Sequence, residues 1–156
     1  PKDLHCVMHS HEVNSQTLAA SKSKLIPLTQ EGCQLYERVG YHEFNGIVLN
    51  DEEKEKLINA IGNEKHTLLM RNHGLITAGP TAAWAFIRHQ HFIRNAEVQL
   101  KLMASNAEMS IISDNVLKHT REQFEGGSAQ AGAKVRHPEW PAFWRLLDTL
   151  DEKWKH

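Results

Sequence analysis

The sequence has little cysteine, no long apolar run and no secretory signal. Its two cysteines, Cys6 and Cys33, are too few for a disulfide framework and form no C-x-x-C pair, which favours reduced, buried thiols. No apolar run approaches the roughly 18 residues of a membrane-spanning helix. The opening residues, PKDLHCVMHSH, lack the layout of a signal peptide. We therefore expect a cytoplasmic protein without a membrane partner.

The chain also lacks an excess of charge of either sign. Its 18 Lys and Arg residues nearly balance 19 Asp and Glu residues, so the formal net charge is -1 and nucleic acid is not an expected partner. Apolar residues make up 40% of 156 residues, which is enough for one compact domain. What the chain does have is 11 histidines, so metal binding or proton chemistry is the first function to consider.

Strand-like and helix-like segments alternate along the chain, which predicts an α/β domain with helices packed on a sheet. The pattern HTLLMRNHGLITA at 66–78 predicts two strands joined by a turn at 72–74. The other expected segments are a strand at 5–9, helices at 13–21, 51–61, 81–105, 113–124 and 139–154, an extended stretch at 24–28, a short helix or turn at 30–39 and an alternating stretch at 41–49.

Two histidines lie two residues apart in the segment VMHSHEV at 7–13. In a strand, side chains alternate between faces, so His9 and His11 would project the same way. Both imidazoles could then reach one cation, at the 2.0–2.1 Å that is typical of zinc. The pattern alone equally allows two unrelated histidines at a strand end.

A third histidine, His73, lies between Asn72 and Gly74, directly after an apolar strand. The glycine lets the backbone turn tightly and lets a ligand approach. Three histidines from two strand ends would leave one metal position open, as in catalytic zinc sites. A turn histidine that bonds its own backbone is the alternative.

Three segments together resemble the class II aldolase/adducin family: VMHSHEV, YHEFNGIVLNDEEKEKLINAIG and LLMRNHGLITAGPTAAWAFIRHQHFIRNAEVQLKL. The ending EWPAFWRLLDTLDEKW is similar to the tail of adducin-like members. The resemblance implies a layered α/β/α sandwich with a central, mainly antiparallel sheet. Residues 1–125 would be the C-terminal portion of the aldolase/adducin-like domain, the Gly- and Ala-rich residues 126–138 a flexible loop, and residues 139–156 an amphipathic helix that packs on the domain or on a neighbouring subunit.

The resemblance also implies a metal-dependent lyase or epimerase of carbohydrate metabolism. In the family a divalent metal, usually zinc, binds three histidines, which map to His9, His11 and His73. The metal polarises the carbonyl of a small hydroxy-carbonyl substrate, such as a sugar phosphate, and stabilises an enediolate while a C–C bond breaks or forms. Family members commonly form tetramers, so a homo-oligomer is expected.

Two features of the family have no counterpart in this sequence. The catalytic acid or base of the family lies well before the two-histidine motif, whereas only eight residues precede His9, and Asp3 does not match that position. The phosphate-binding loop of the family, further upstream, is missing as well. The chain therefore resembles the C-terminal two-thirds of such a domain, and its catalytic residues are unknown. A non-enzymatic, adducin-like module for protein contacts is the alternative function.

Several other polar residues have two interpretations. Arg71 could bind an anionic substrate group, although pairing with a carboxylate is favoured. His89 and His91 point about 200° apart on a helix and cannot share a metal, so they are expected to be solvated or at an interface. Asn72, Gly74 and His42 are expected to lie beside the substrate or behind the metal ligands. For His42, a position on the surface of a strand is the alternative.

Overall fold

Four strands form one mixed sheet in the order β1-β4-β3-β2. The β1–β4 and β3–β4 pairs are antiparallel, whereas β2 and β3 are parallel. The computed structural model describes residues 4–46, 51–130, 137 and 139–150. Its elements are β1 (Cys6–Ser10), α1 (Val13–Ala20), α2 (Gln30–Cys33), β2 (Val39–His42), α3 (Asp51–Ile61), β3 (Thr67–Met70), β4 (Gly74–Gly79), α4 (Ala82–Ser105), α5 (Asp114–Gln130) and α6 (Trp140–Thr149). The mainly antiparallel sheet is as expected.

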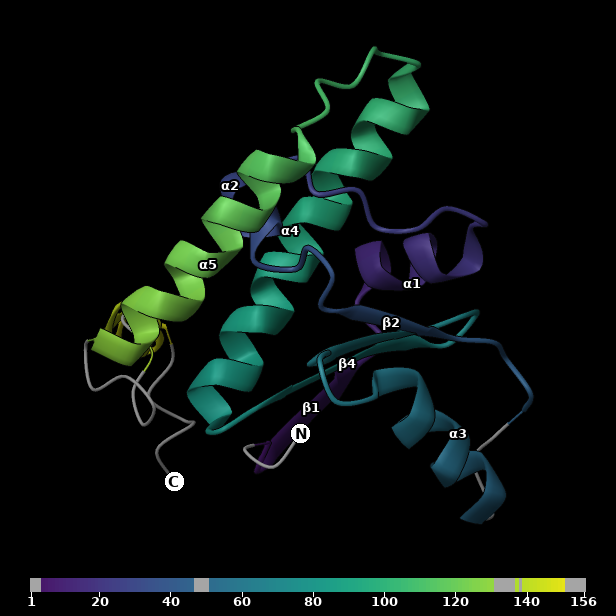
Figure 1. Cartoon of the computed structure of the whole chain (residues 1–156), viewed down its shortest axis with the longest axis horizontal. Coiled ribbons are helices and arrows are strands. Elements are labelled where there is room, and N and C mark those ends of the chain that lie inside the picture. Colours follow the sequence, from purple (N-terminus) through teal and green to yellow (C-terminus); the bar gives the residue numbers. More distant parts are fainter. Residues whose placement is uncertain (1–3, 47–50, 131–136, 138, 151–156) are drawn as a thin grey trace.

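Helices cover both faces of the sheet (Figure 1). The long helix α4 packs against β1 and β4, and α1 packs against α4, β4 and β3. The acidic helix α3 contacts β2 and β3 from the other side. All four residues of β3 are buried, as is typical of a strand that is covered on both faces. The expected layered α/β arrangement is therefore confirmed.

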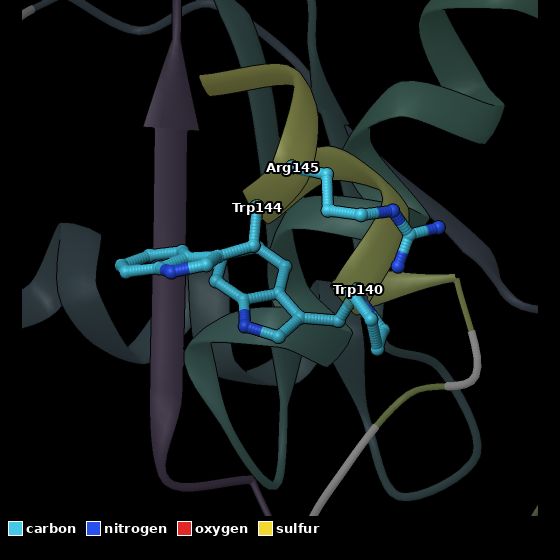
Figure 2. A pocket seen from close by; sticks show the side chains of 4 residues that line it. Trp140, Trp144 and Arg145 are labelled. Atoms are coloured by element: carbon cyan, nitrogen blue, oxygen red, sulfur yellow. The ribbon is translucent and has the colours of Figure 1, made fainter. Parts of the chain in front are cut away.

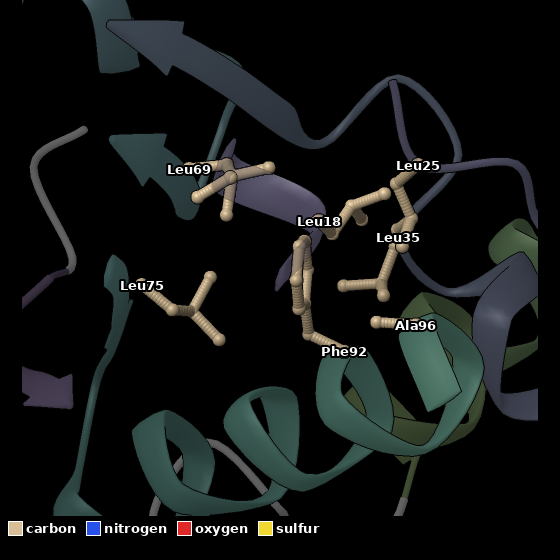
Figure 3. Packing of buried hydrophobic residues seen from close by; sticks show 8 residues of the cluster. Leu18, Leu25, Leu35, Leu69, Leu75, Phe92 and Ala96 are labelled. Atoms are coloured by element: carbon tan, nitrogen blue, oxygen red, sulfur yellow. The ribbon is translucent and has the colours of Figure 1, made fainter. Parts of the chain in front are cut away.

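The apolar core lies between the sheet and helices α1 and α4 (Figure 3). Phe92 on α4 is fully buried and faces Leu69 and Leu75, which come from neighbouring strands. The remaining members of the cluster are Leu18, Ala19, Leu25, Leu35 and Ala96. This core holds α4 and α1 against β3 and β4.

Two buried amides on α4 hold the extended stretch at 24–29. The Oδ1 atom of Asn95 accepts from the backbone N–H of Leu28 at 2.8 Å, and its Nδ2 donates to the carbonyl of Ile26 at 2.8 Å. Gln99 accepts from the N–H of Ile26 at 2.8 Å and donates to the carbonyl of Lys24 at 2.9 Å. These side chains satisfy backbone groups that have no strand partner.

The structure refines one sequence-based expectation and corrects another. The alternating stretch at 41–49 begins within β2, which spans Val39–His42, and Gly46 adopts φ 101°, as the turn signal Asn45-Gly46 predicts; residues 47–49 lie outside the described part. The flexible loop expected at 126–138 is wrong at 126–130, because α5 continues to Gln130. Glycine costs about 1 kcal/mol in a helix, which the surrounding helix formers can offset. Apart from His137, the rest of that stretch lies outside the described residues.

The last described helix, α6, packs on α4 through aromatic rings. The Phe86 ring on α4 lies 5.7 Å from the Trp140 ring and 5.1 Å from the Phe143 ring, between centroids. Trp140, Trp144 and Arg145 line a pocket at α6 (Figure 2). The expected helix at 139–154 is thus present as Trp140–Thr149, and Trp154 lies outside the described residues.

The cysteines and the helices relate to two expectations that were drawn from composition. Cys33 is buried, whereas Cys6 is only half-buried, and both thiols are free. No helix in the described part of the chain is long and apolar enough to cross a membrane.

Candidate metal centre

The pairing of β1 with β4 brings the three motif histidines together. His9 lies opposite Ile76 in the ladder, so the end of β1 runs beside the turn that begins β4. One ligand atom from each of His9, His11 and His73 lies within 4.8 Å of the others, and the ring centroids are 4.8–5.0 Å apart. Elsewhere in the described ranges, no other group of three His, Cys, Asp or Glu residues comes as close together.

The hydrogen bonds of His9 orient its free nitrogen toward the cluster. Its Nδ1 lies 3.0 Å from the carbonyl oxygen of Leu75, and because a carbonyl can only accept, Nδ1 carries the hydrogen. The lone pair of the neutral ring is then on Nε2, which lies 3.0 Å from Nε2 of His11. Two nitrogens bound tetrahedrally to one zinc at 2.0–2.1 Å are about 3.3 Å apart. The 3.0 Å contact is within hydrogen-bond range, and it is also compatible with two ligands of one ion.

Gly74 allows the strands to approach at this point. A Cβ atom at Gly74 would lie 2.4 Å from the carbonyl oxygen of Ser10, 2.9 Å from Cδ2 of His11 and 3.3 Å from Cε1 of His9. Any larger residue would push the histidines away from the turn. Gly74 thus lies directly against His9 and His11, and a role behind bound metal ligands stays a prediction.

The turn itself is held by α1. Asn72 adopts φ 54°, a left-handed conformation that asparagine tolerates, and its N–H donates to the carbonyl of Ala19 at 3.2 Å. The Nε2 of Gln16 donates to the carbonyl of His73 at 3.0 Å. The sequence analysis did not identify Gln16, because nothing in its local pattern distinguishes it from a solvated helix residue. Contact of Asn72 with a substrate stays a prediction.

The environment of His73 favours its neutral form. Burial, followed by the nearby His9 and His11, lowers the pKa of His73 below its ordinary value. Neutral imidazole is the form that binds a metal. Near pH 7 this side chain therefore offers a lone pair rather than a positive charge.

His42 lies next to the cluster rather than within it. Together with Arg71 and His73 it lines a small pocket at the end of β2 and β3. Its Nε2 lies 3.7 Å from a carboxylate oxygen of Glu53, and its side chain is 12% exposed. Of the two interpretations, a position that lines the candidate site fits better than a surface strand position.

Arg71 has a structural role that the sequence did not indicate. Its Nη1 donates to the carbonyls of Ser21 and Ser23, each at 2.9 Å, and its guanidinium lies 5.1 Å from the centroid of the Tyr41 ring. Among the described residues no ion pair joins Arg71 to a carboxylate, so the favoured expectation is not borne out there; its Nη1 donates instead to backbone carbonyls just after α1. Arg71 thereby ties the turn before β4 to the loop after α1.

The two histidines of α4 are buried, not solvated. His89 is 1% exposed and His91 is 3% exposed. The expectation failed because α4 is covered on several sides, by the sheet, α1 and α2. His91 lies 2.9 Å from Oε1 of Gln34 and 3.3 Å from a carboxylate oxygen of Glu139, so it links α2 to the start of α6.

The structure is a layered α/β fold in which three histidines converge at strand ends, and comparison with known proteins identifies its family. Residues 1–100 match the Class II Aldolase and Adducin N-terminal domain family. The chain belongs to this family. Class II aldolases generally use a divalent metal, commonly zinc.

Individual relatives agree with this assignment. A Caulobacter vibrioides protein named "Putative aldolase class 2 protein" is 34% identical over 154 residues, which cover 94% of this chain and 56% of that protein. Alpha-adducin of Rattus norvegicus is 28% identical over 156 residues, which cover 95% of this chain and 21% of that protein. The chain thus spans about half the length of its aldolase-type relative and a smaller share of adducin.

Solved structures confirm the α/β class II aldolase fold. An aldolase II superfamily protein from Pseudomonas syringae superposes with a TM-score of 0.76 at 27% identity, covering 94% of this chain and 55% of that chain. L-fuculose 1-phosphate aldolase from Glaciozyma antarctica PI12 superposes with a TM-score of 0.74 at 21% identity, covering 94% and 54%.

Proposed function

We propose that His9, His11 and His73 bind one divalent metal ion in an open centre of the class II aldolase type. The observation that carries this proposal is the convergence of three imidazole nitrogens within 4.8 Å of one another. Two of the side chains are exposed, so a substrate could reach an ion held there. A three-ligand site of this kind leaves positions open, as catalytic zinc sites do.

The residues around the cluster prepare it for a metal. Donation from Nδ1 of His9 to the carbonyl of Leu75 fixes the ring and leaves Nε2 as the ligand atom. The lowered pKa of His73 keeps its imidazole neutral near pH 7. When bound, a divalent metal supplies a Lewis acid that polarises a substrate carbonyl.

The substrate class follows from the family rather than from the pocket. We propose a lyase or epimerase that acts on a small hydroxy-carbonyl compound resembling a sugar phosphate, with zinc as the metal. The fold similarity to an L-fuculose 1-phosphate aldolase is compatible with this class. Because the chain spans about half of its aldolase-type relative, the activity of the whole protein, its homo-oligomeric state and its cytoplasmic location are part of the proposal.

Elemental analysis of protein purified without chelators tests the metal site. We expect about one zinc or similar divalent ion per chain, and its loss in His73→Ala. His5→Ala is a matched control, because His5 is an exposed histidine just before β1 that is not part of the cluster. Absence of metal from folded wild-type protein after incubation with zinc would overturn the proposal.

An adducin-like role in protein contacts is the second candidate. It is favoured by the match to alpha-adducin, which extends over 95% of this chain. This function does not require an ion at the three histidines. A folded protein that binds no zinc, and whose His73→Ala variant behaves like the wild type, would favour this alternative.

A further inference from the structure

A buried histidine that the sequence patterns did not connect with the metal motif lies directly behind it. The Nε2 atom of His89 on α4 lies 2.6 Å from the hydroxyl oxygen of Ser10. Ser10 is the residue between His9 and His11, and as the strand alternates it points toward α4 while the histidines point away. His89 thus contacts the backbone segment that carries two of the three proposed ligands.

The partners of His89 allow only one assignment of its donor and acceptor nitrogens. Thr77 on β4 has one hydroxyl hydrogen, which it donates to the carbonyl of Ala85 at 2.8 Å. Its oxygen therefore accepts from Nδ1–H of His89, which lies 3.0 Å away. In the neutral ring Nε2 is then the acceptor, so the Ser10 hydroxyl donates to it.

Burial ensures that this arrangement persists near neutral pH. Burial, followed by the nearby His9, lowers the pKa of His89 to about 4. The side chain is 1% exposed, so water does not compete for its nitrogens. The Ser10 hydroxyl oxygen also lies 3.4 Å from the backbone N–H of Glu12, which extends the connection past His11 to the start of α1.

We propose that His89 is a positioning residue for the metal centre: through Ser10 it fixes the end of β1 and thereby the spacing of His9 and His11. This inference rests on the proposed metal site. Removing the acceptor would leave a hydroxyl without its partner and free the strand end to move. Supporting groups behind metal ligands typically change metal affinity by 10–100-fold.

Zinc affinity, measured by competition with a chromogenic chelator, tests the proposal. We expect His89→Leu and Ser10→Ala each to weaken zinc binding by about 10-fold or more. Since both changes break the same contact, the double variant should bind about as weakly as either single variant. His89→Gln retains an acceptor for the Ser10 hydroxyl and should recover part of the affinity.

His91→Leu is the matched control. It removes a similarly buried histidine from the same helix, but its partners, Gln34 and Glu139, come from the end of α2 and the residue before α6 rather than from β1. It should leave zinc affinity within about twofold of the wild type, whatever it does to the thermal midpoint. The visible spectrum of the Co²⁺ form should change with His89→Leu and not with His91→Leu.

The outcomes separate this inference from the proposed function. If wild-type protein binds zinc but the Ser10 and His89 variants bind it equally well, the positioning role is wrong and the metal site stands. If affinity falls in the His91 variant as much as in the His89 variant, general destabilisation explains the effect and the positioning role is again wrong. If the wild type binds no zinc, both ideas fail.

Discussion

At the scale of single residues, the candidate site depends on how closely two strand ends approach. The nitrogens of His9 and His11 are 3.0 Å apart because the two residues lie two apart on one face, and the pairing of β1 with β4 brings His73 to them. At Gly74 the strands are so close that a Cβ atom would lie 2.4 Å from the carbonyl oxygen of Ser10. Small changes there should therefore affect the histidines before they affect the rest of the fold.

Gly74→Ala should weaken zinc binding by at least about 10-fold and destabilise the protein by about 1–3 kcal/mol, because its Cβ would overlap the carbonyl of Ser10. Chelator competition and denaturant unfolding would measure the two effects. Gly126→Ala is a suitable control: it lies in α5, its Cβ meets nothing within 4 Å, and it should stabilise the helix slightly. Unchanged zinc affinity in Gly74→Ala would argue against this account of the site.

Also at the residue scale, the sequence predicted that the three histidines come together, but not the contacts that hold their strand ends in place. Periodicity and spacing describe neighbours along the chain, and these indicated that His9 and His11 share a face. The partners of Ser10 and Arg71 come from distant segments, His89 on α4 and the loop after α1. Such contacts exist only after the elements pack, so no local pattern reports them.

At the scale of elements, α4 organises the domain with polar as well as apolar side chains. Its amides Asn95 and Gln99 act as partners for the backbone of 24–29, which has no regular structure of its own. The helical pattern predicted the bounds of α4 well, whereas its His89 and His91 were expected to be solvated or at an interface. On a helix that is covered on several sides, polar side chains can be buried, and they are then hydrogen-bonded.

Asn95→Ala should destabilise the protein by about 2–4 kcal/mol, because it leaves backbone groups of Ile26 and Leu28 without partners in the interior. Denaturant unfolding would measure this loss. Asn59→Ala on the exposed surface of α3 is the control and should change stability by less than about 0.5 kcal/mol. Equal effects of the two substitutions would contradict the role assigned to Asn95.

At the scale of the whole molecule, buried histidines make stability depend on pH. Burial lowers the pKa of His89 and of His137 to about 4, from an ordinary value near 6.5. Between these values the unfolded chain binds protons that the folded chain does not, so the free energy of unfolding decreases as the pH falls from about 6.5 to about 4. Above pH 6.5 these two groups contribute no pH dependence.

Thermal unfolding of metal-free protein in the presence of chelator should therefore show a lower midpoint at pH 5 than at pH 7. His89→Leu should reduce this difference, because it removes one of the groups that takes up a proton on unfolding. The pH range lies above that in which most carboxylates titrate, so their contribution is small. A midpoint that is constant between pH 7 and pH 5 would show that these histidines are not held neutral by burial.

The whole-molecule fold was predictable to a large extent because the strand–turn–strand at 66–78 and the long helix at 81–105 have strong local patterns, and both are present. The continuation of α5 through Gly126 was not predictable, since composition favoured a loop. The division of the chain into a domain at 1–125 and a separate terminal helix stays a prediction. Metal binding by the three histidines also stays a prediction, although their convergence supports it.

The most direct test of the central claim is a crystal structure of the protein soaked with zinc, with anomalous differences measured at the zinc edge. We predict one strong peak within about 2.0–2.1 Å of a ring nitrogen of each of His9, His11 and His73. His9 should bind through Nε2 and keep its Nδ1 contact with Leu75. Saturating zinc with no peak between these three imidazoles would contradict the account.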